Sequence, residues 1–211
     1  TEALNTALRG ARGDVLTFAT EHAAVLDCEN PVRTEGRRFT VLPVKRDGRA
    51  DLAALDGALE SGCGLVSAMA INNEIGTRAP LGEIATAARE NGALVLVDAV
   101  QAYGRVPLTE IDADFIAISA HKIHGPKGIG ALWMRDGIRV EPLMFGGGQE
   151  AHLRSGTLSP ALCAGFGAAA QIAEERMAAD AEHIEALWVR ARELFAGWTL
   201  NGSASERWHG N

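Results

Sequence analysis

The chain alternates short apolar runs with longer amphipathic segments, and this alternation constrains the fold more than any other feature of the sequence. A short apolar run is typical of a strand buried on both faces, whereas an amphipathic segment predicts a helix that covers such strands. Repeated strand–helix–strand units favour a parallel sheet, because each crossover helix returns the chain in the same direction. The sequence therefore predicts an α/β fold with a mostly parallel sheet flanked by helices.

The strands and helices can be assigned to particular segments. Strands are predicted at residues 15–18, 39–44, 65–70, 93–97, 115–119 and 130–134. Helices are predicted at residues 2–8, within 51–60, and at 81–91, 161–179 and 181–195. Asn91 and Gly92 close the third of these helices, because glycine readily adopts the left-handed conformation found after many helices. The glycine-rich segments 121–130 and 145–157 are predicted to be ordered loops, and long loops in compact domains are commonly functional.

Composition excludes several classes of function. Hydrophobic residues make up 47% of the 211 residues, which is enough for a substantial core in one large domain or two small ones. The formal net charge is -7 and no dense Lys/Arg run is present, so we expect no nucleic-acid partner. No apolar stretch approaches the roughly 20 residues that cross a bilayer, and no signal peptide is visible. We therefore expect no membrane partner either.

The cysteines and histidines do not form a recognisable metal site. Cys28, Cys63 and Cys163 are widely spaced and contain no C-x-x-C pair, which argues against a zinc site or a disulfide framework and fits a reducing cytoplasm. Each cysteine is expected to be a small buried or half-buried hydrophobe. His121 and His124 are close in sequence, but no third ligand stands near them. The sequence therefore predicts no metal.

Polar residues follow four of the predicted strands. Ligands of an open α/β sheet gather at the carboxyl ends of its strands. The polar residues at these ends are Glu21, His22, Asn72, Asn73, Glu74, Asp98, Gln101, Ser119, His121 and Lys122. Pyridoxal 5′-phosphate requires such a set: a lysine amine for its aldehyde and a carboxylate that keeps its ring nitrogen protonated. It also requires a flat group against the ring, and hydroxyls and amides for its oxygens.

A nucleotide site is the competing interpretation of these strand ends. The nearest match to a glycine fingerprint is G-C-G-L-V-S at residues 62–67. It lacks the last glycine, and it precedes a predicted strand instead of following one. The sequence therefore does not predict a dinucleotide site.

Five motifs in a fixed order carry a resemblance to a known family. They are T-E-H at 20–22, N-N-E-I-G at 72–76, V-D-A-V-Q at 97–101, S-A-H-K-I-H-G-P-K-G-I-G-A-L at 119–132, and G-G-G-Q-E at 146–150 with R-S-G-T-L at 154–158. From residue 1 to about residue 177, the chain resembles the cysteine desulfurase branch of the class V aminotransferase-like enzymes of fold type I. The resemblance implies conversion of L-cysteine to L-alanine. The sulfur would leave as a persulfide for iron–sulfur cluster assembly or other thiolation.

The resemblance also implies a role for each matching residue. Lys122 would bind the cofactor aldehyde as a Schiff base, Asp98 would pair with the ring nitrogen, and His22 would stack on the ring and shuttle protons. Gln101 and Asn73 would lie beside the phenolic oxygen. Phosphate contacts are implied for Thr1, Ser119, His121 and, from the other subunit of a homodimer, Thr157.

Each of these residues, taken alone, also has a purely structural interpretation. Lys122 could be a solvated loop lysine, Asp98 a helix cap and His22 a residue at a helix start. The amide and hydroxyl side chains at the other positions could serve only turns and backbone caps. Their joint occurrence in one order favours the cofactor site.

The chain departs from the family pattern in three places. Ala120 stands where the family often has glycine, and Thr1 aligns within a family motif. The family's mobile cysteine loop and the arginine that grips the substrate carboxylate lie downstream of residue 211. We therefore expect a large domain truncated at both ends over 1–195 and the start of a small C-terminal domain over 196–211. Cys163 follows R-S-G-T-L within a predicted helix, so it is not assigned as the nucleophile.

Two alternatives to a desulfurase stay open. One is another class V enzyme, such as a selenocysteine lyase or a small-amino-acid aminotransferase, and the downstream sequence would distinguish it. The other is a non-catalytic scaffold, which would bind no pyridoxal phosphate. The partners expected for a desulfurase are L-cysteine, a second copy of the chain, and sulfur-acceptor or iron–sulfur scaffold proteins.

Overall fold

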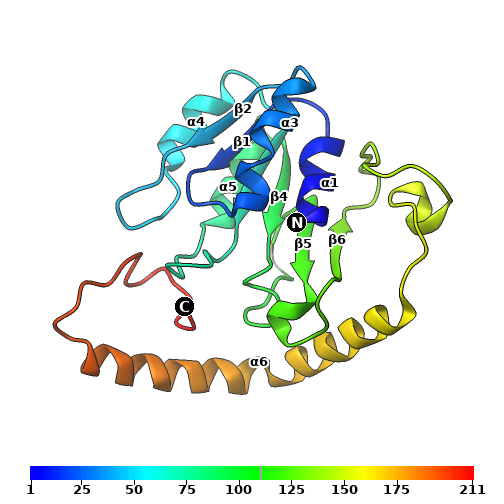
Figure 1. Ribbon diagram of the computed structural model, residues 1–211. Helices are drawn as coiled ribbons and strands as arrows, with labels where there is room; N and C mark the ends of the chain where they lie inside the picture. Colours follow the sequence, from blue (N-terminus) through cyan, green and yellow to red (C-terminus); the bar gives the residue numbers. More distant parts are fainter. Residues whose placement is uncertain (110) are drawn as a thin grey trace.

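The computed structural model describes residues 1–109 and 111–211, and a six-stranded sheet forms its centre (Figure 1). The strands lie in the order β2-β1-β3-β4-β5-β6. Their bounds are β1 Val15–Phe18, β2 Phe39–Leu42, β3 Leu65–Met69, β4 Leu94–Asp98, β5 Phe115–Ser119 and β6 Gly130–Met134. Neighbouring strands are parallel except for β5 and β6, which are antiparallel. The predicted α/β fold with a mostly parallel sheet is confirmed.

Helices connect and cover these strands. The α-helices are α1 Glu2–Gly10, α2 Ala23–Leu26, α3 Glu29–Thr34, α4 Leu52–Leu59, α5 Leu81–Glu90 and α6 Pro160–Leu194. Two short 3₁₀ helices are η1 Ala120–Ile123 and η2 Gln149–His152. The helix start expected at His22 is confirmed by α2. The sequence does not predict α3, η1 or η2, because such short segments cannot display a helical period.

The longest helix, α6, runs through 35 residues without a break. The prediction of two helices here, over 161–179 and 181–195, is wrong. No glycine or proline follows Gly167 within the helix, so nothing in the backbone interrupts it. At the expected break, Arg176 donates to the Asp180 carboxylate at 2.9 Å across one helical turn. None of the described helices, α6 included, has an apolar stretch long enough to traverse a bilayer.

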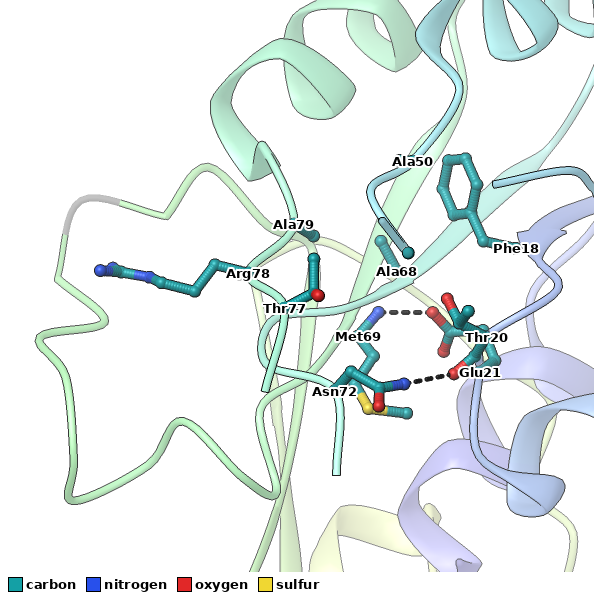
Figure 2. Close-up of a pocket in the computed structure, with 11 residues that line it drawn as sticks. Phe18, Thr20, Glu21, Ala50, Ala68, Met69, Asn72, Thr77, Arg78 and Ala79 are labelled. Atoms are coloured by element: carbon teal, nitrogen blue, oxygen red, sulfur yellow. Dashed lines mark hydrogen bonds between the residues drawn. The ribbon is translucent and has the colours of Figure 1, made fainter. Parts of the chain in front are cut away.

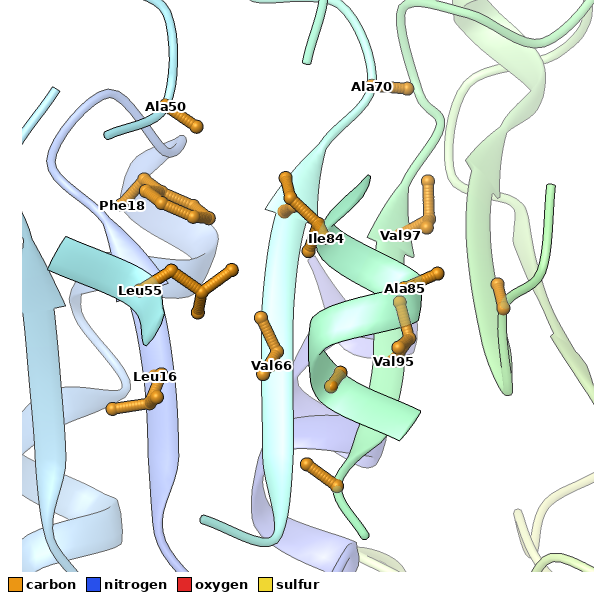
Figure 3. Close-up of a cluster of buried hydrophobic side chains, with 14 of the residues drawn as sticks. Leu16, Phe18, Ala50, Leu55, Val66, Ala70, Ile84, Ala85, Val95 and Val97 are labelled. Atoms are coloured by element: carbon orange, nitrogen blue, oxygen red, sulfur yellow. The ribbon is translucent and has the colours of Figure 1, made fainter. Parts of the chain in front are cut away.

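Two apolar layers sandwich the central strands. Strands β1 and β3 are buried along their whole length, which explains why their sequences are almost continuously apolar. On one face, Leu16 of β1 packs in a cluster with Leu55 of α4 and Ile84 of α5 (Figure 3). On the other face, Val15 packs in a second cluster with Leu8 of α1. Burying a side chain of this size contributes about 1.5–3 kcal/mol, so these layers hold the strand ends firmly in place.

The segment after α6 turns back toward the end of the sheet (Figure 1). Thr77 and Arg207 form an isolated antiparallel bridge. The Asn211 side-chain amide donates to the backbone oxygen of Asn73 at 2.8 Å. The last residues of the chain therefore pack against the loop that follows β3.

The three cysteines are free and differ in exposure. Cys28 is buried in the turn between α2 and α3, and Cys63 is half-buried just before β3. Cys163 is exposed near the start of α6, so the expectation of burial is wrong for this residue.

Candidate active site

The parallel strands bring their carboxyl ends to one edge of the sheet. Met69 of β3 lies beside Asp98 of β4, and Asp98 lies beside Ala117 of β5. The antiparallel strand β6 begins at the same edge, where Gly130 pairs with Ser119. The residues that follow β1, β3, β4 and β5 therefore lie along one edge, where open α/β sheets bind their ligands.

Asp98 is the buried acid at the centre of this edge. The residue is 3% exposed, and its Oδ1 atom accepts a hydrogen bond from the Val100 backbone nitrogen at 2.9 Å. Burial raises the pKa of Asp98 above its ordinary value, while this hydrogen bond and the nearby His22 imidazole act in the opposite direction. A buried carboxylate in this position is stabilised by a cation placed against it.

Lys122 lies on η1, directly after the carboxyl end of β5, and is half-buried. The Ser119 hydroxyl at the strand end lies 2.9 Å from Nδ1 of His121. The three residues thus place a hydroxyl, an imidazole and an amine within four positions of the chain. Strand β5 is paired with β4, so this segment is adjacent to the strand that ends in Asp98.

The turn that carries Lys122 is tightly packed. Ala120 is fully buried in a cluster with Ile123 and Phe166 of α6. The Gly125 backbone nitrogen donates to the Ala120 oxygen at 2.9 Å, and a Cβ atom at Gly125 would lie only 2.9 Å from that oxygen. The alanine at 120, where the resembled family often has glycine, therefore fills space in this small core. Close packing on both sides fixes the backbone on which Lys122 is mounted.

His22 stands at the start of α2, after the carboxyl end of β1. Its Nδ1 atom accepts a hydrogen bond from the Ala24 backbone nitrogen at 3.0 Å. This bond leaves Nε2 as the N–H nitrogen of the neutral ring. The residue is exposed, and its ring when protonated lowers the pKa of Asp98, so the ring lies near that carboxylate. His22 is thus a helix cap that also presents an imidazole at this edge.

Thr1 begins α1 and lies at the same edge. Its side chain makes no capping hydrogen bond, so the hydroxyl is not committed to the helix. The Asn5 side chain of α1 donates to the Ala24 backbone oxygen at 2.9 Å, which ties the start of α1 to α2. The free N–H groups and dipole of a helix start favour an anion.

Two amide residues flank the acid in neighbouring loops. Gln101 is buried in the turn after β4, and its side-chain oxygen accepts a hydrogen bond from Arg105. The amide nitrogen of Gln101 is the group that can still donate to a ligand. Asn73 is half-buried in the loop after β3, and Asn211 holds its backbone oxygen.

Thr157 comes from a different part of the fold. It is exposed in the glycine-rich loop between β6 and α6, and it neither follows a strand nor begins α1. The loop is braced by its own contacts: Ser155 Oγ donates to the Gly147 oxygen at 2.7 Å, and the Gly156 nitrogen donates to Gln149 Oε1 at 3.0 Å. Every predicted site residue except Thr157 therefore lies at or just after the carboxyl end of a strand or begins α1.

Two further residues organise this edge although the sequence assigns them no role. Asn72 Nδ2 donates to the Thr20 oxygen at 2.8 Å, and Glu21 Oε1 accepts from the Met69 nitrogen at 2.6 Å. Both bonds tie the loop after β1 to the end of β3. The N-N-E-I-G string indicates a turn at Asn72. The burial of Glu21 has no comparable signal in the sequence.

Metal ligation finds no support among residues 1–109 and 111–211, because no three His, Cys, Asp or Glu side chains are grouped there so as to hold an ion. His121 faces Ser119, and His124 ends η1 in a left-handed conformation with φ of 63°. The chemistry available at this edge is therefore that of an amine, a buried carboxylate, imidazoles, amides and hydroxyls.

The sequence profile of the family described as "Aminotransferase class-V" matches residues 1–197. The chain belongs to the class V aminotransferase family. Enzymes of this family depend on pyridoxal phosphate. The carboxyl-end edge of this class V chain offers groups of the kind that the cofactor needs. Asp98 is a buried carboxylate that a cationic ring nitrogen would stabilise, and Lys122 is an amine just after the end of the adjacent strand.

Curated relatives of this class V chain are cysteine desulfurases. The mitochondrial cysteine desulfurase of Candida maltosa is 44% identical over 198 residues, which cover 89% of this chain and 41% of that protein. Cysteine desulfurase IscS of Rickettsia massiliae is 40% identical over 226 residues, with coverage of 100% and 55%. A solved structure described as a NifS-like protein has a TM-score of 0.90 and 32% identity, covering 99% of this chain and 60% of that one. The chain spans about half the length of the curated relatives it matches.

Proposed function

We propose that this chain carries the cofactor site of a pyridoxal 5′-phosphate-dependent cysteine desulfurase. The whole protein would convert L-cysteine to L-alanine and pass the sulfur on as a persulfide, for iron–sulfur cluster assembly or other thiolation. The observation that carries the proposal is the placement of Asp98 and the Ser119–His121–Lys122 segment on the adjacent strand ends of β4 and β5. The relatives named above support the choice of reaction.

The proposed roles follow from the chemistry of each side chain. When bound, pyridoxal phosphate supplies an electron sink for bonds at the carbons of an amino acid. Lys122 is the proposed amine that holds the cofactor and moves a proton at the substrate α-carbon. Asp98 would keep the ring nitrogen protonated, and His22 would lie against the ring face and carry protons. Gln101 and Asn73 would lie beside the phenolic oxygen.

The phosphate would bind where helix-start N–H groups and hydroxyls meet. Thr1 offers its uncommitted hydroxyl at the start of α1, where an anion is favoured. Ser119 and His121 are the further proposed phosphate ligands. Thr157 would reach the phosphate of the partner subunit, which makes the proposed assembly a homodimer with shared sites.

The thiol that receives the sulfur is proposed to lie outside residues 1–211. A thiolate attacks the sulfur of bound cysteine and the Cβ–S bond breaks, so the products are alanine and a persulfide. Such a thiolate must be mobile, because it has to reach the substrate and then an acceptor protein. Burial raises the pKa of Cys28 and of Cys63, and Cys163 is fixed within α6. These three thiols are therefore poor candidates for the carrier.

The proposal includes an organisation and a location. Residues 1–195 would form the cofactor-binding large domain, and 196–211 would begin a small C-terminal domain. The match of the family profile to residues 1–197 is in keeping with that division. The free cysteines favour a reducing compartment, and we propose the cytoplasm.

Product analysis of the full-length protein tests the proposed function. With pyridoxal phosphate, L-cysteine and a reductant, we expect alanine and sulfide in equal amounts over many turnovers. Lys122→Ala should abolish both products, whereas Lys127→Ala, an exposed lysine of the same loop, should change neither. Alanine formed only from selenocysteine would indicate a lyase, and amino-group transfer without sulfide would indicate an aminotransferase. Failure to bind the cofactor would favour a scaffold.

A further inference from the structure

Glu21 is a buried carboxyl group for which the proposed reaction has no use. The residue lies in the loop after β1 and is 7% exposed. Its Oε1 atom accepts a hydrogen bond from the Met69 nitrogen at 2.6 Å, and its Oε2 atom has no hydrogen-bond partner among the described residues. Buried carboxylates are normally paired with a cation, because an isolated buried charge is very costly. Arg78 and Glu21 line the same small cavity, but the Arg78 side chain extends away from Glu21 (Figure 2), and no arginine or lysine of the described residues shifts the pKa of Glu21.

The charged group that acts on Glu21 is another carboxyl, Asp98. Met69, which binds Glu21, is in register with Asp98 on the adjacent strand. Burial and the neighbouring Asp98 raise the pKa of Glu21 well above its ordinary value. A buried carboxyl beside another carboxyl resists ionisation, because the second negative charge is not screened by water. Asp98 faces the His22 imidazole and Glu21 faces no cation, so the proton belongs on Glu21.

The contacts of Glu21 connect two loops of the proposed site. Figure 2 shows the bond from Met69 to Glu21 and a second bond from the Asn72 amide to Thr20, which runs between the same two loops. The first loop continues into His22, and the second continues into Asn73. Glu21 therefore helps to set the position of an imidazole and an amide that the proposed function places against the cofactor.

The space beside Glu21 is too small for a substrate. The cavity that it lines with Thr20, Asn72 and Thr77 has a volume of about 20 Å³. A cavity of that size holds about one water molecule. That cavity has no room for cofactor or amino acid beside the buried Glu21 carboxyl, so we treat Glu21 as a positioning residue.

We propose that Glu21 is held as a neutral carboxylic acid that clamps the His22 loop to the end of β3, and so leaves Asp98 as the carboxylate available to the ring nitrogen of the cofactor. The first part concerns this chain alone. The last clause rests on the proposed function. A neutral acid still accepts from Met69 through Oε1, and it buries no unpaired charge at Oε2, which a carboxylate would do.

Infrared spectroscopy of the full-length protein tests the proton directly. A protonated carboxyl gives a C=O stretching band that shifts in heavy water, and we expect Glu21→Gln to remove one such band at neutral pH. Glu74→Gln is the matched control, because Glu74 is an exposed acid of the neighbouring loop. If Glu21→Gln leaves the carboxylic-acid bands unchanged, Glu21 is ionised and the proposal is overturned. This measurement needs no cofactor.

Cofactor binding tests the positioning role. Glutamine mimics the neutral acid in shape and charge, so Glu21→Gln should keep the dissociation constant of pyridoxal phosphate within about threefold. The absorption of the cofactor bound to Glu21→Gln should also depend on pH as it does in the wild-type protein. A purely structural role of Glu21 would not require this agreement. Glu21→Ala removes the clamp and should weaken binding by about tenfold or more.

The outcomes of these tests separate the two proposals. Binding weakened about tenfold by Glu21→Gln, or a titration moved by about one pH unit, would mean that the charge of Glu21 is needed and would overturn the inference. If Glu21→Ala fails to fold, the Glu21→Gln variant still shows whether the charge of Glu21 is needed. If the infrared band is lost but wild-type protein binds no cofactor, the neutral acid is upheld and the proposed function is the part that fails.

Discussion

Arg154 donates two hydrogen bonds to the Glu2 carboxylate, from Nε at 2.6 Å and from Nη2 at 3.3 Å. The pair joins the glycine-rich loop that carries Thr157 to the first turn of α1, which begins at Thr1. The two side chains are 39% and 54% exposed, so the pair contributes little to the stability of the whole fold. The effect of this pair should be confined to the glycine-rich loop, which the pair helps to keep ordered.

Arg154→Ala should therefore loosen the loop without unfolding the protein. We expect the free energy of unfolding to change by less than about 1 kcal/mol, while protease cleavage within 145–157 becomes faster. Arg176→Ala, which breaks a comparable exposed pair on α6, is the control. Exchanging the charges, with Glu2→Arg and Arg154→Glu together, should restore slow cleavage. Equal cleavage of wild type and Arg154→Ala would contradict this role.

A second group of charges stabilises the opposite edge of the sheet. Asp114 is 1% exposed and accepts hydrogen bonds from Arg89 at 2.7 Å, from Arg135 at 3.1 Å and from the Val95 nitrogen at 2.8 Å. Asp114→Asn should lower the free energy of unfolding by roughly 3–5 kcal/mol, because two arginines lose their buried partner. Asp112→Asn, at an exposed acid of the same network, should cost less than about 1 kcal/mol. Urea unfolding measures both, and equal losses would rule out the difference in burial as the cause.

The pH dependence of stability should report the proton on Glu21. Its raised pKa means that the folded state holds this proton more tightly than the unfolded state. The resulting stabilisation is complete below the unfolded carboxyl pKa of about 4.3 and is lost as the pH rises through the folded value. Glu21→Gln should remove this fall, although Asp98, whose pKa is also raised, keeps a part of it. Parallel stability curves for wild type and variant, measured without cofactor, would refute the expectation.

The cysteines should differ in reactivity toward iodoacetamide. The thiolate is the reactive form, and burial raises the pKa of both Cys28 and Cys63 above the ordinary thiol value. At neutral pH, Cys163 should be modified first, because it is exposed on α6. Modification of Cys28 and Cys63 should increase only as the pH passes above the ordinary thiol range. Mass spectrometry of the three peptides gives the order, and urea-unfolded protein, in which all three should react alike, is the control.

Subunit mixing tests the proposed sharing of sites. A Lys122→Ala chain and a Thr157→Ala chain each form damaged homodimers. In the mixed dimer, one site would have its own Lys122 and its partner's intact Thr157, while the other would lack both. We therefore expect desulfurase activity to recover on mixing. Activity no higher than that of the separate variants would mean that Thr157 does not act across an interface.

Local sequence was sufficient for most of the sheet but not for the contacts between loops. The strands at 15–18, 115–119 and 130–134 coincide with the observed ones, because uninterrupted apolar runs bounded by glycine or polar residues leave few other conformations. The break expected near Asp180 was wrong, since one polar residue does not end a helix without glycine or proline. The burial of Glu21 and the pairing of Arg154 with Glu2 depend on which loops meet in space. No local pattern carries that information.

The unbroken course of α6 has a mechanical consequence. Its 35 residues make a rod about 52 Å long, seated near its start where Phe166 meets Tyr103 with ring centroids 6.3 Å apart. Farther along, Trp188 stacks on His209 with ring centroids 4.7 Å apart, and this contact supports the C-terminal half of the helix. The helix is thus fixed near its start and supported again farther along. A tilt of about 5° at Phe166 would displace its far end, about 42 Å away, by about 4 Å. The chain segment that follows α6 moves with this end of the helix. The stack of Trp188 on His209 therefore limits how far that segment can move relative to Lys122.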